Sequence, residues 1–243
     1  GVTLESLNNN TGTIALLSSG GINGGSGTVL MRAANYAFGG ADRTITTTGV
    51  LTIEPDADEN SFASSFDNQY LNPVSVTGLT LGKSSNASAI TLSRAISLSG
   101  PVSIYGGSID VNANITANSG NILLDADTGS TLNQSSTGIL LDDAITIETV
   151  TSGNLTLIGR SGDTGSGFDG IDASSANTTT LRSAGNLTLQ GYSYAASGSG
   201  RGVDLNNDVI AASGTVSMTG QHNTGATYAL SLSGSTSITA GTG

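Results

Sequence analysis

A short recurring pattern constrains the fold of this chain more than any other feature of its sequence. A Gly followed by Thr, Asn or Pro opens a tetrad, and most copies place two apolar side chains two positions apart. Side chains at that spacing point to the same face of a β-strand. The intervals between copies fit a solenoid turn of roughly 20 residues lengthened by loops of different size. Tetrads begin at Thr13, Thr28, Pro101, Asn121, Asn154, Asn186 and Thr215.

The last third of the chain shows the repeat in its longest form. Copies from Asn154 and Asn186 share Asn-Leu-Thr-Leu-x-Gly, a later Gly-Ser-Gly and then Gly-Ile/Val-Asp, and a degenerate third copy begins at Thr215. We interpret each copy over 154–243 as one circuit of three short strands. Successive coils of a parallel solenoid lie about 4.8 Å apart, so equivalent residues should stack in ladders. The predicted internal ladders are Leu155, Leu187 and Val216; Leu157, Leu189 and Met218; and Ile171, Val203 and Leu230, with Thr156, Thr188 and Ser217 facing solvent.

The repeat is interrupted between residues 54 and 72. This stretch is acidic and then aromatic, and it holds Phe62, Phe66 and Tyr70. A long ordered loop needs an apolar cluster of its own, so an excursion from the coil is the simplest interpretation, with a helix as the alternative. The sequence therefore predicts an all-β fold: a single β-solenoid segment over 1–243, with irregular loop excursions.

Composition supports a packed β fold and argues against several partners. Charged residues make up 10% of the chain and hydrophobic residues 36%, whereas disorder needs high charge and few aliphatic residues. The net charge of −11 repels nucleic acid and anionic membranes, because affinity for both depends on clustered Lys and Arg. Membrane insertion is not expected, since no apolar window is long enough to span a bilayer. The chain has no Cys, which excludes disulfides and thiolate metal sites.

The run from Val50 to Leu124 resembles repeats of the filamentous-haemagglutinin-like exoproteins of Gram-negative bacteria, many of them exported by two-partner secretion. Its most specific part is Ser99–Asn114, Ser-Gly-Pro-Val-Ser-Ile-Tyr-Gly-Gly-Ser-Ile-Asp-Val-Asn-Ala-Asn. The resemblance implies a right-handed parallel β-helix, a secreted or cell-surface location, and a role in adhesion, biofilm or surface structure. The Asn-Pro-Asn motifs of the family's secretion domain are missing, the nearest match being Asn72-Pro73-Val74. The chain therefore resembles the repetitive shaft and not the secretion cap.

Residues suited to catalysis do not gather in the sequence, so no catalytic or cofactor-binding residue and no enzymatic activity is predicted. His222 is the only histidine, and neither a Cys nor a Gly-x-Ser-x-Gly elbow accompanies it. Paired carboxylates could cleave glycosides, but neither aromatic platforms nor neighbouring Arg residues are evident beside them. The pairs considered are Asp142 with Asp143, Asp125 with Asp127, and Asp172 with Asp204.

Two acidic segments have the oxygen donors that Ca²⁺ prefers. One comprises Asp56, Asp58, Glu59 and Asn60; the other comprises Asp163 and Thr164, between Gly162 and Gly165, together with the later Asp169. Neither has the spacing of an EF-hand or of the Gly-Gly-x-Gly-x-Asp nonapeptide. Solvated acidic loops are the favoured interpretation, and no metal or other cofactor is predicted. The Thr side chains that would line up on successive coils form a column only one residue wide, and this argues against ice binding.

The sequence thus predicts a structural or adhesive shaft segment, with a carbohydrate-binding or carbohydrate-cleaving β-helix as the alternative. A sugar site needs aromatic residues gathered in one groove, and Tyr192 and Tyr194, in a predicted loop near Phe168, are its only nucleus. Neither end of the chain reads as a polar cap or as a signal peptide, so we expect a longer chain or stacking of copies end to end into filaments. The expected partners are a host or neighbouring-cell surface, or further copies of the chain.

Overall fold

The computed structural model describes most of the chain as short β-strands. The described residues are 1–6, 11–17, 21–39, 43–56, 59–126, 136–142, 144–164, 166–174, 176–223 and 228–241. They form 27 strands and contain no helix. Within these ranges nothing meets the length and hydropathy of a membrane-crossing helix. The chain is therefore all-β over its described part.

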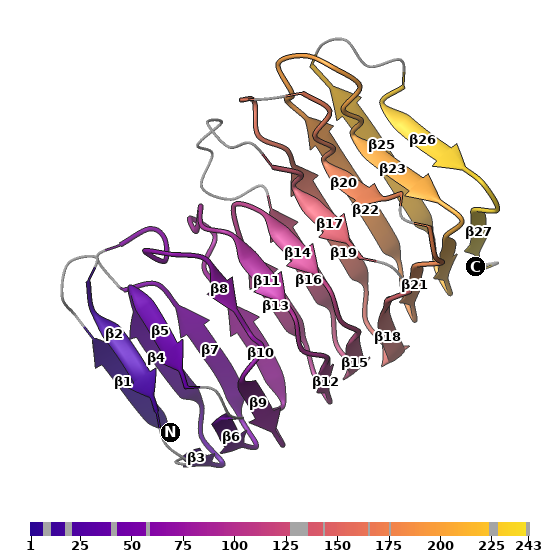
Figure 1. Ribbon diagram of the computed structural model, residues 1–243. Coiled ribbons are helices and arrows are strands. Elements are labelled where there is room, and N and C mark those ends of the chain that lie inside the picture. The colour runs from indigo at the N-terminus through magenta and orange to yellow at the C-terminus, as the bar shows by residue number, and fades with distance from the viewer. Residues whose placement is uncertain are drawn as a thin grey trace.

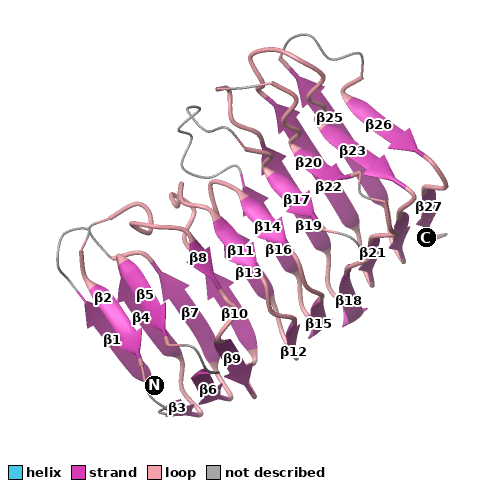
Figure 2. Cartoon of the chain, viewed as in Figure 1, coloured by secondary structure: helices cyan, strands magenta, loops and turns pink. Residues whose placement is uncertain are grey.

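Among the described residues all of the strand pairing is parallel, and wherever two strands pair they are three places apart in the chain (Figures 1 and 2). One sheet of nine strands runs along the whole molecule. Its strands, in spatial order, are β1 (Val2–Ser6), β4 (Val29–Ala33), β7 (Val50–Glu54), β10 (Gly78–Leu81), β13 (Val102–Tyr105), β16 (Ile122–Ala126), β19 (Leu155–Arg160), β22 (Leu187–Ser193) and β25 (Val216–His222).

Two further sheets complete the coils over the C-terminal two thirds of the chain. The seven-stranded sheet contains β8 (Phe66–Asp67), β11 (Ile90–Leu92), β14 (Ile109–Val111), β17 (Ile139–Leu141), β20 (Ile171–Ala173), β23 (Val203–Asn206) and β26 (Leu230–Ser233). The six-stranded sheet contains β12 (Ile96–Leu98), β15 (Ile115–Ser119), β18 (Thr146–Ser152), β21 (Thr180–Ser183), β24 (Val209–Ala212) and β27 (Ser237–Ala240).

Near the N-terminus the corresponding sheets are short and separate. One pairs β2 (Thr13–Leu16) with β5 (Asn35–Phe38), and the other contains β3 (Ile22–Gly25), β6 (Arg43–Thr47) and β9 (Leu71–Val74). Residues 54–72, where we predict an excursion, span the end of β7, a connection from residue 55, β8 and the start of β9. The alternative of a helix there is not found among the described residues. The stacked parallel sheets are consistent with a β-solenoid.

Alternation of apolar and polar residues explains why these segments become strands. In β19 and β22 every second side chain is buried, and the intervening ones are half-buried on the other face. The predicted register is confirmed, because Leu155 lies beside Leu187 and Leu187 beside Val216. The third ladder also forms, as Ile171 lies beside Val203 and Val203 beside Leu230.

The last coil departs from the prediction that every ladder member is internal. Val216 and Met218 are partly exposed, and the side chain of Leu230 is 38% exposed. Within the described residues the strands of this coil have a neighbouring coil on one side only. One face of each of these apolar side chains therefore lacks the cover that Leu187 receives from both sides.

An asparagine ladder fixes the corner at which the chain enters the long sheet. The side-chain oxygen of Asn121 accepts the backbone N–H of Asn154 at 2.8 Å, and that of Asn154 accepts the N–H of Asn186 at 2.8 Å. Asn186 in turn accepts the N–H of Thr215 at 2.9 Å. Each oxygen satisfies a donor that the strand ladder leaves free. The recurring Gly-Asn of the sequence is thus explained as a stack of corner hydrogen bonds.

Glycine recurs two residues after each of the last three tetrads for a steric reason. A Cβ atom on Gly159, Gly191 or Gly220 would lie 2.0, 1.9 or 2.1 Å from a backbone carbonyl oxygen of the following wall. For Gly191 that oxygen belongs to Gly202, which directly precedes β23. Two backbones can approach this closely only where no side chain intervenes.

Candidate functional site

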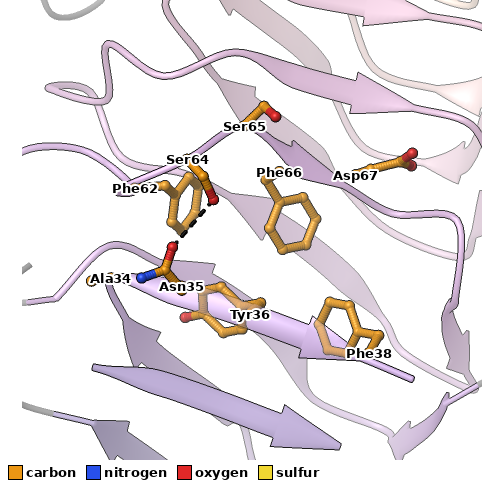
Figure 3. Close-up of a pocket in the computed structure, with 9 residues that line it drawn as sticks. All are labelled: Ala34, Asn35, Tyr36, Phe38, Phe62, Ser64, Ser65, Phe66 and Asp67. Carbon is orange, nitrogen blue, oxygen red and sulfur yellow. Dashed lines mark hydrogen bonds between the residues drawn. The ribbon is translucent and has the colours of Figure 1, made fainter. Parts of the chain in front are cut away.

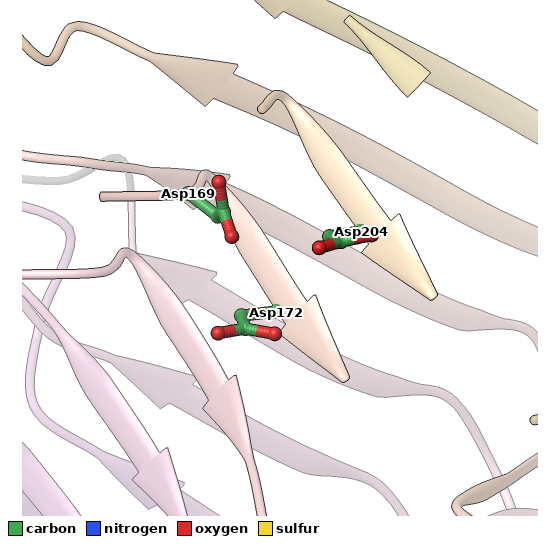
Figure 4. A group of neighbouring side chains, drawn as sticks. All are labelled: Asp169, Asp172 and Asp204. Carbon is green, nitrogen blue, oxygen red and sulfur yellow. The ribbon is translucent and has the colours of Figure 1, made fainter. Parts of the chain in front are cut away.

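Three places on the molecule bring together side chains that could bind a ligand or take part in a reaction. The first is a group of three carboxylates on the seven-stranded sheet, namely Asp169, Asp172 and Asp204 (Figure 4). The second is a small aromatic cavity between β5 and β8 (Figure 3). A larger cavity lies at the carboxyl ends of β22 and β25.

Register explains why the three carboxylates meet. Asp172 and Asp204 are lateral neighbours in β20 and β23, and Asp169 lies in the turn that precedes β20. One carboxylate oxygen from each lies within 4.8 Å of the others. Asp169 and Asp204 are buried, whereas Asp172 is half-buried. The strand repeat therefore stacks like charges that would repel one another.

Arg201 and two backbone amides compensate part of this negative charge. The guanidinium of Arg201 forms an ion pair with Asp204, and the backbone N–H of Arg201 donates to Asp169. The N–H of Ser174 donates to Asp172 at 2.8 Å. The expectation that no Arg accompanies the carboxylate pairs is therefore wrong for Asp172 and Asp204, because Arg201, three residues before Asp204, turns back onto it.

Burial dominates the titration of this region. Desolvation, with a smaller contribution from the charges of Asp172 and Asp204, raises the pKa of Asp169 to about 7. Burial likewise raises the pKa of Asp208, whose carboxylate accepts the N–H groups of Thr179 and Asn206, to about 6. At neutral pH Asp169 is close to half-protonated. Partial protonation of Asp169 and the ion pair of Arg201 with Asp204 both lower the repulsion among the three carboxylates.

The other predicted carboxylate pairs lie apart from this group or partly outside the described residues. Asp125 is half-buried in β16, and Asp142 is exposed directly after β17. Their predicted partners, Asp127 and Asp143, lie outside the described residues.

Of the first predicted calcium segment, Asp56, Glu59 and Asn60 are described and Asp58 is not. Asp56 is buried, and its Oδ1 has no hydrogen-bond partner. The ammonium of Lys83 donates to the carbonyl oxygens of Asp56 and Glu59. A cation of the protein itself therefore already binds the backbone oxygens of this loop.

In the second predicted calcium segment, Asp163 and Thr164 lie in the connection before β20. Asp163 is half-buried, and its Oδ1 is also without a partner. Gly165 lies outside the described residues. Asp169 is the one member of this segment that joins the carboxylate group.

The aromatic cavity lies where the second wall of the coil is interrupted. Tyr36 and Phe38 of β5 face Phe62 and Phe66, with ring centroids 5.5 to 6.0 Å apart (Figure 3). The Tyr36 hydroxyl lies 2.8 Å from the carbonyl oxygens of Met31 and Glu54, and burial raises its pKa. The cavity measures about 30 Å³, which is room for only one or two waters. It is a packing gap and not a ligand site.

The larger cavity includes two of the residues named for a sugar site. It measures about 150 Å³ and is lined by Tyr192, Ser193, Tyr194, Gln221, His222 and Asn223. Tyr192 lies within β22, and not in a loop as predicted. Phe168 does not line the cavity, although its carbonyl oxygen accepts the Ser193 hydroxyl at 2.7 Å. His222, the only histidine of the sequence, lines the same cavity as the two tyrosines. Its position beside them was not predicted from the sequence.

No known protein family, curated protein or solved structure matches this chain. The resemblance of Val50–Leu124 to filamentous-haemagglutinin-like repeats therefore stays a prediction from the sequence.

Proposed function

We propose that this chain is a structural and adhesive shaft segment, without enzymatic activity, of a secreted or cell-surface bacterial exoprotein. The observation that supports it is the nine-stranded parallel sheet, which stacks coil upon coil from Val2 to His222 without interruption. Such an array extends in one direction, and each coil contacts only its neighbours. An elongated body of this kind suits the presentation of a binding surface at a distance.

A right-handed winding belongs to the same proposal. Connections between parallel strands of one sheet are right-handed in about 98% of cases, because a right-twisted strand packs back onto its sheet most easily that way. Each coil here connects one strand of the long sheet to the next parallel strand, through the other two walls, so the rule applies to this chain. The filamentous-haemagglutinin-like resemblance implies the same hand.

End-to-end association of copies follows from the last described coil. Leu230, Leu232 and Ile238 are 38%, 46% and 45% exposed, and β25, β26 and β27 each have one open edge. The edges of β1, β2 and β3 are open at the opposite end. Open parallel edges with exposed apolar side chains favour strand addition. A second copy, added head to tail, would continue all three walls and form a filament.

Adhesion and association call for separate experiments. Beads coated with the chain should be retained on epithelial or bacterial cell layers above beads coated with an unrelated β-solenoid of similar charge. Equal retention would refute the adhesive function. In sedimentation velocity the wild type should form larger species as concentration rises, and an L232K/I238K variant should stay monomeric. A wild type that stays monomeric at all concentrations, without filaments in electron micrographs, would refute stacking.

A further inference from the structure

We infer that the cavity at the carboxyl ends of β22 and β25 binds one neutral sugar ring of a glycan. The inference names the chemical class that the proposed adhesive surface would recognise, and its biological meaning rests on that proposed function. The site combines two tyrosines with two amides, an imidazole and a hydroxyl. Aromatic walls with a few convergent polar groups are the usual composition of a small-molecule site.

Strand register places these groups opposite one another. On the long sheet Tyr192 lies beside Gln221, and Ser193 lies beside His222. Asn223 follows directly, and its N–H donates to the carbonyl oxygen of Ser193 at 2.9 Å. Neighbouring strands of a sheet lie about 4.8 Å apart. Successive side chains of a strand point to opposite faces, so Tyr192 and Gln221 share one face of the sheet and Ser193 and His222 the other. Both pairs border the cavity where the strands end.

Neighbouring contacts hold the tyrosine side of the cavity in place. The guanidinium carbon of Arg160 lies 5.1 Å from the ring centroid of Tyr194, within the range of a cation–π contact. The backbone N–H of Tyr194 donates to the Ser161 hydroxyl at 2.9 Å. Both contacts are present without any ligand. Binding would therefore require less ordering of side chains than at a loop of free tyrosines.

The chemistry of the lining matches a sugar better than other small ligands. Gln, Asn, His, Ser and Tyr side chains both donate and accept hydrogen bonds, as sugar hydroxyls do. A tyrosine ring supplies a flat apolar face for the C–H face of a pyranose. The cavity volume of about 150 Å³ is roughly ten times the 10–15 Å³ that one water needs on the same measure, which is room for a single ring and not for a longer chain.

The site binds a sugar ring and does not cleave glycosides. Glycoside hydrolysis uses a pair of carboxylates that flank the scissile bond, and the described residues that line this cavity include no Asp or Glu. The carboxylate group of Figure 4 belongs to a different wall, on β20 and β23. A site for one ring should bind weakly, with a Kd on the order of 1 mM.

His222 provides a direct probe, because it is the only histidine in the chain. Chain labelled with ¹³C-histidine gives a single pair of imidazole resonances. These should shift saturably when methyl glycosides of glucose, galactose, mannose or N-acetylglucosamine are added, at least for one of the four. Y194A and Q221A should each weaken the response at least tenfold. Y105A, which changes a half-buried tyrosine of β13 away from the cavity, should leave it unchanged.

The outcomes separate this inference from the proposed adhesive function. No saturable shift with any of the four glycosides would overturn the glycan site, as would a folded Y194A variant that responds like the wild type. Equal shifts with phenol at the same concentration would also overturn it, because they would show a general aromatic pocket. Saturable shifts without bead retention would support the site and refute adhesion. Retention that Y194A does not reduce would leave adhesion intact and remove this site from it.

Discussion

Replacing Leu187 by Ala tests the register and the core together. Leu187 is fully buried in β22, with Leu155 beside it in one coil and Val216 in the other. The change deletes three carbons, each of which contributes roughly 0.8 kcal/mol when buried. Coils on both sides limit collapse of the cavity that remains, and measured Leu→Ala costs reach about 2–5 kcal/mol. We expect the free energy of unfolding to fall by about 3 kcal/mol.

Two control variants make the result specific to the ladder. Thr188, the next residue, is half-buried on the outer face, so T188A should change the unfolding free energy by no more than about 0.5 kcal/mol. Val216 occupies the same ladder as Leu187 in the last coil and is only partly buried. V216A should therefore cost about 1 kcal/mol or less, because fewer of the deleted atoms leave water on folding.

Urea unfolding followed by far-UV circular dichroism measures all three variants. Stacked repeats lose their end coils before their middle ones. Hydrogen exchange of the β22 amides should therefore be measured beside the urea curves, and it should rank the three variants in the same order. Equal losses for L187A and T188A would refute the predicted orientation of the strand. A V216A loss as large as that of L187A would refute the view that the last coil is less well covered.

Three further predictions follow from the corners and the carboxylates. G191A should lower the free energy of unfolding in urea by at least about 2 kcal/mol, since its Cβ would overlap a backbone oxygen. The control G167A should cost only about 1 kcal/mol, because its Cβ would meet open space and only the positive φ of 76° is unfavourable. N154A should cost about 1 kcal/mol through the lost corner hydrogen bond, and N154D, which keeps the acceptor, should recover part of it. The pKa of Asp169 is about 7 in the folded chain, against 3.8 for the free group. Between these values the native state keeps a proton that the unfolded chain has lost. The free energy of unfolding should therefore fall by a few kcal/mol between pH 4 and pH 7 and level off above pH 7. D169N should make that decline shallower, the remainder coming from Asp208, whose pKa is raised to about 6, and an unchanged slope would contradict the assignment.

The sequence was most informative where coils repeat at similar length. The segments from Asn154 and Asn186 align residue for residue as far as their Gly-Ile/Val-Asp, and the degenerate segment from Thr215 keeps the same order of apolar residues, so their ladders could be written down in advance. The tetrad was less reliable near the N-terminus. Thr13 opens β2 of the short two-stranded sheet, whereas the other six tetrads open strands of the long sheet. A Gly-Thr pair marks a corner of the coil, but the four residues of a tetrad do not distinguish one corner from another.

Three strands of the long sheet, β1, β7 and β10, carry no tetrad. In each of them a Gly precedes or begins the strand, but an apolar residue follows it directly. The corner polar residue is what the pattern detects, and it is not needed for the strand itself. Leu51 and Leu79 lie beside one another and are buried like the tetrad residues. Inward packing therefore defines the sheet, and the corner chemistry only accompanies it.

The carboxylate group could be predicted in part. The repeated Gly-Ile/Val-Asp places Asp172 beside Asp204 by register alone, and a stacked pair of like charges calls for compensation nearby. Arg201, three residues before Asp204, was the available signal for it. Asp169 could not be found in this way, because it lies in a turn whose path depends on the connection before it. Its raised pKa comes chiefly from burial, which sequence alone does not report.

The interruption of two walls near the N-terminus shows where repeat reasoning ends. β8 pairs forward with β11 but not back with β5, and β9 pairs back with β6 but not forward with β12. Among the described strands, only the long sheet continues without a break at this point, because β7 pairs with β10. Phe62 and Phe66 were visible as an aromatic pair in the interrupted stretch, but their partners Tyr36 and Phe38 come from an earlier coil. Packing of four rings stands in for a strand ladder there, beside one backbone hydrogen bond from the N–H of Ala63 to the carbonyl oxygen of Ala34 at 2.8 Å. A pattern built on strand pairing does not predict such packing.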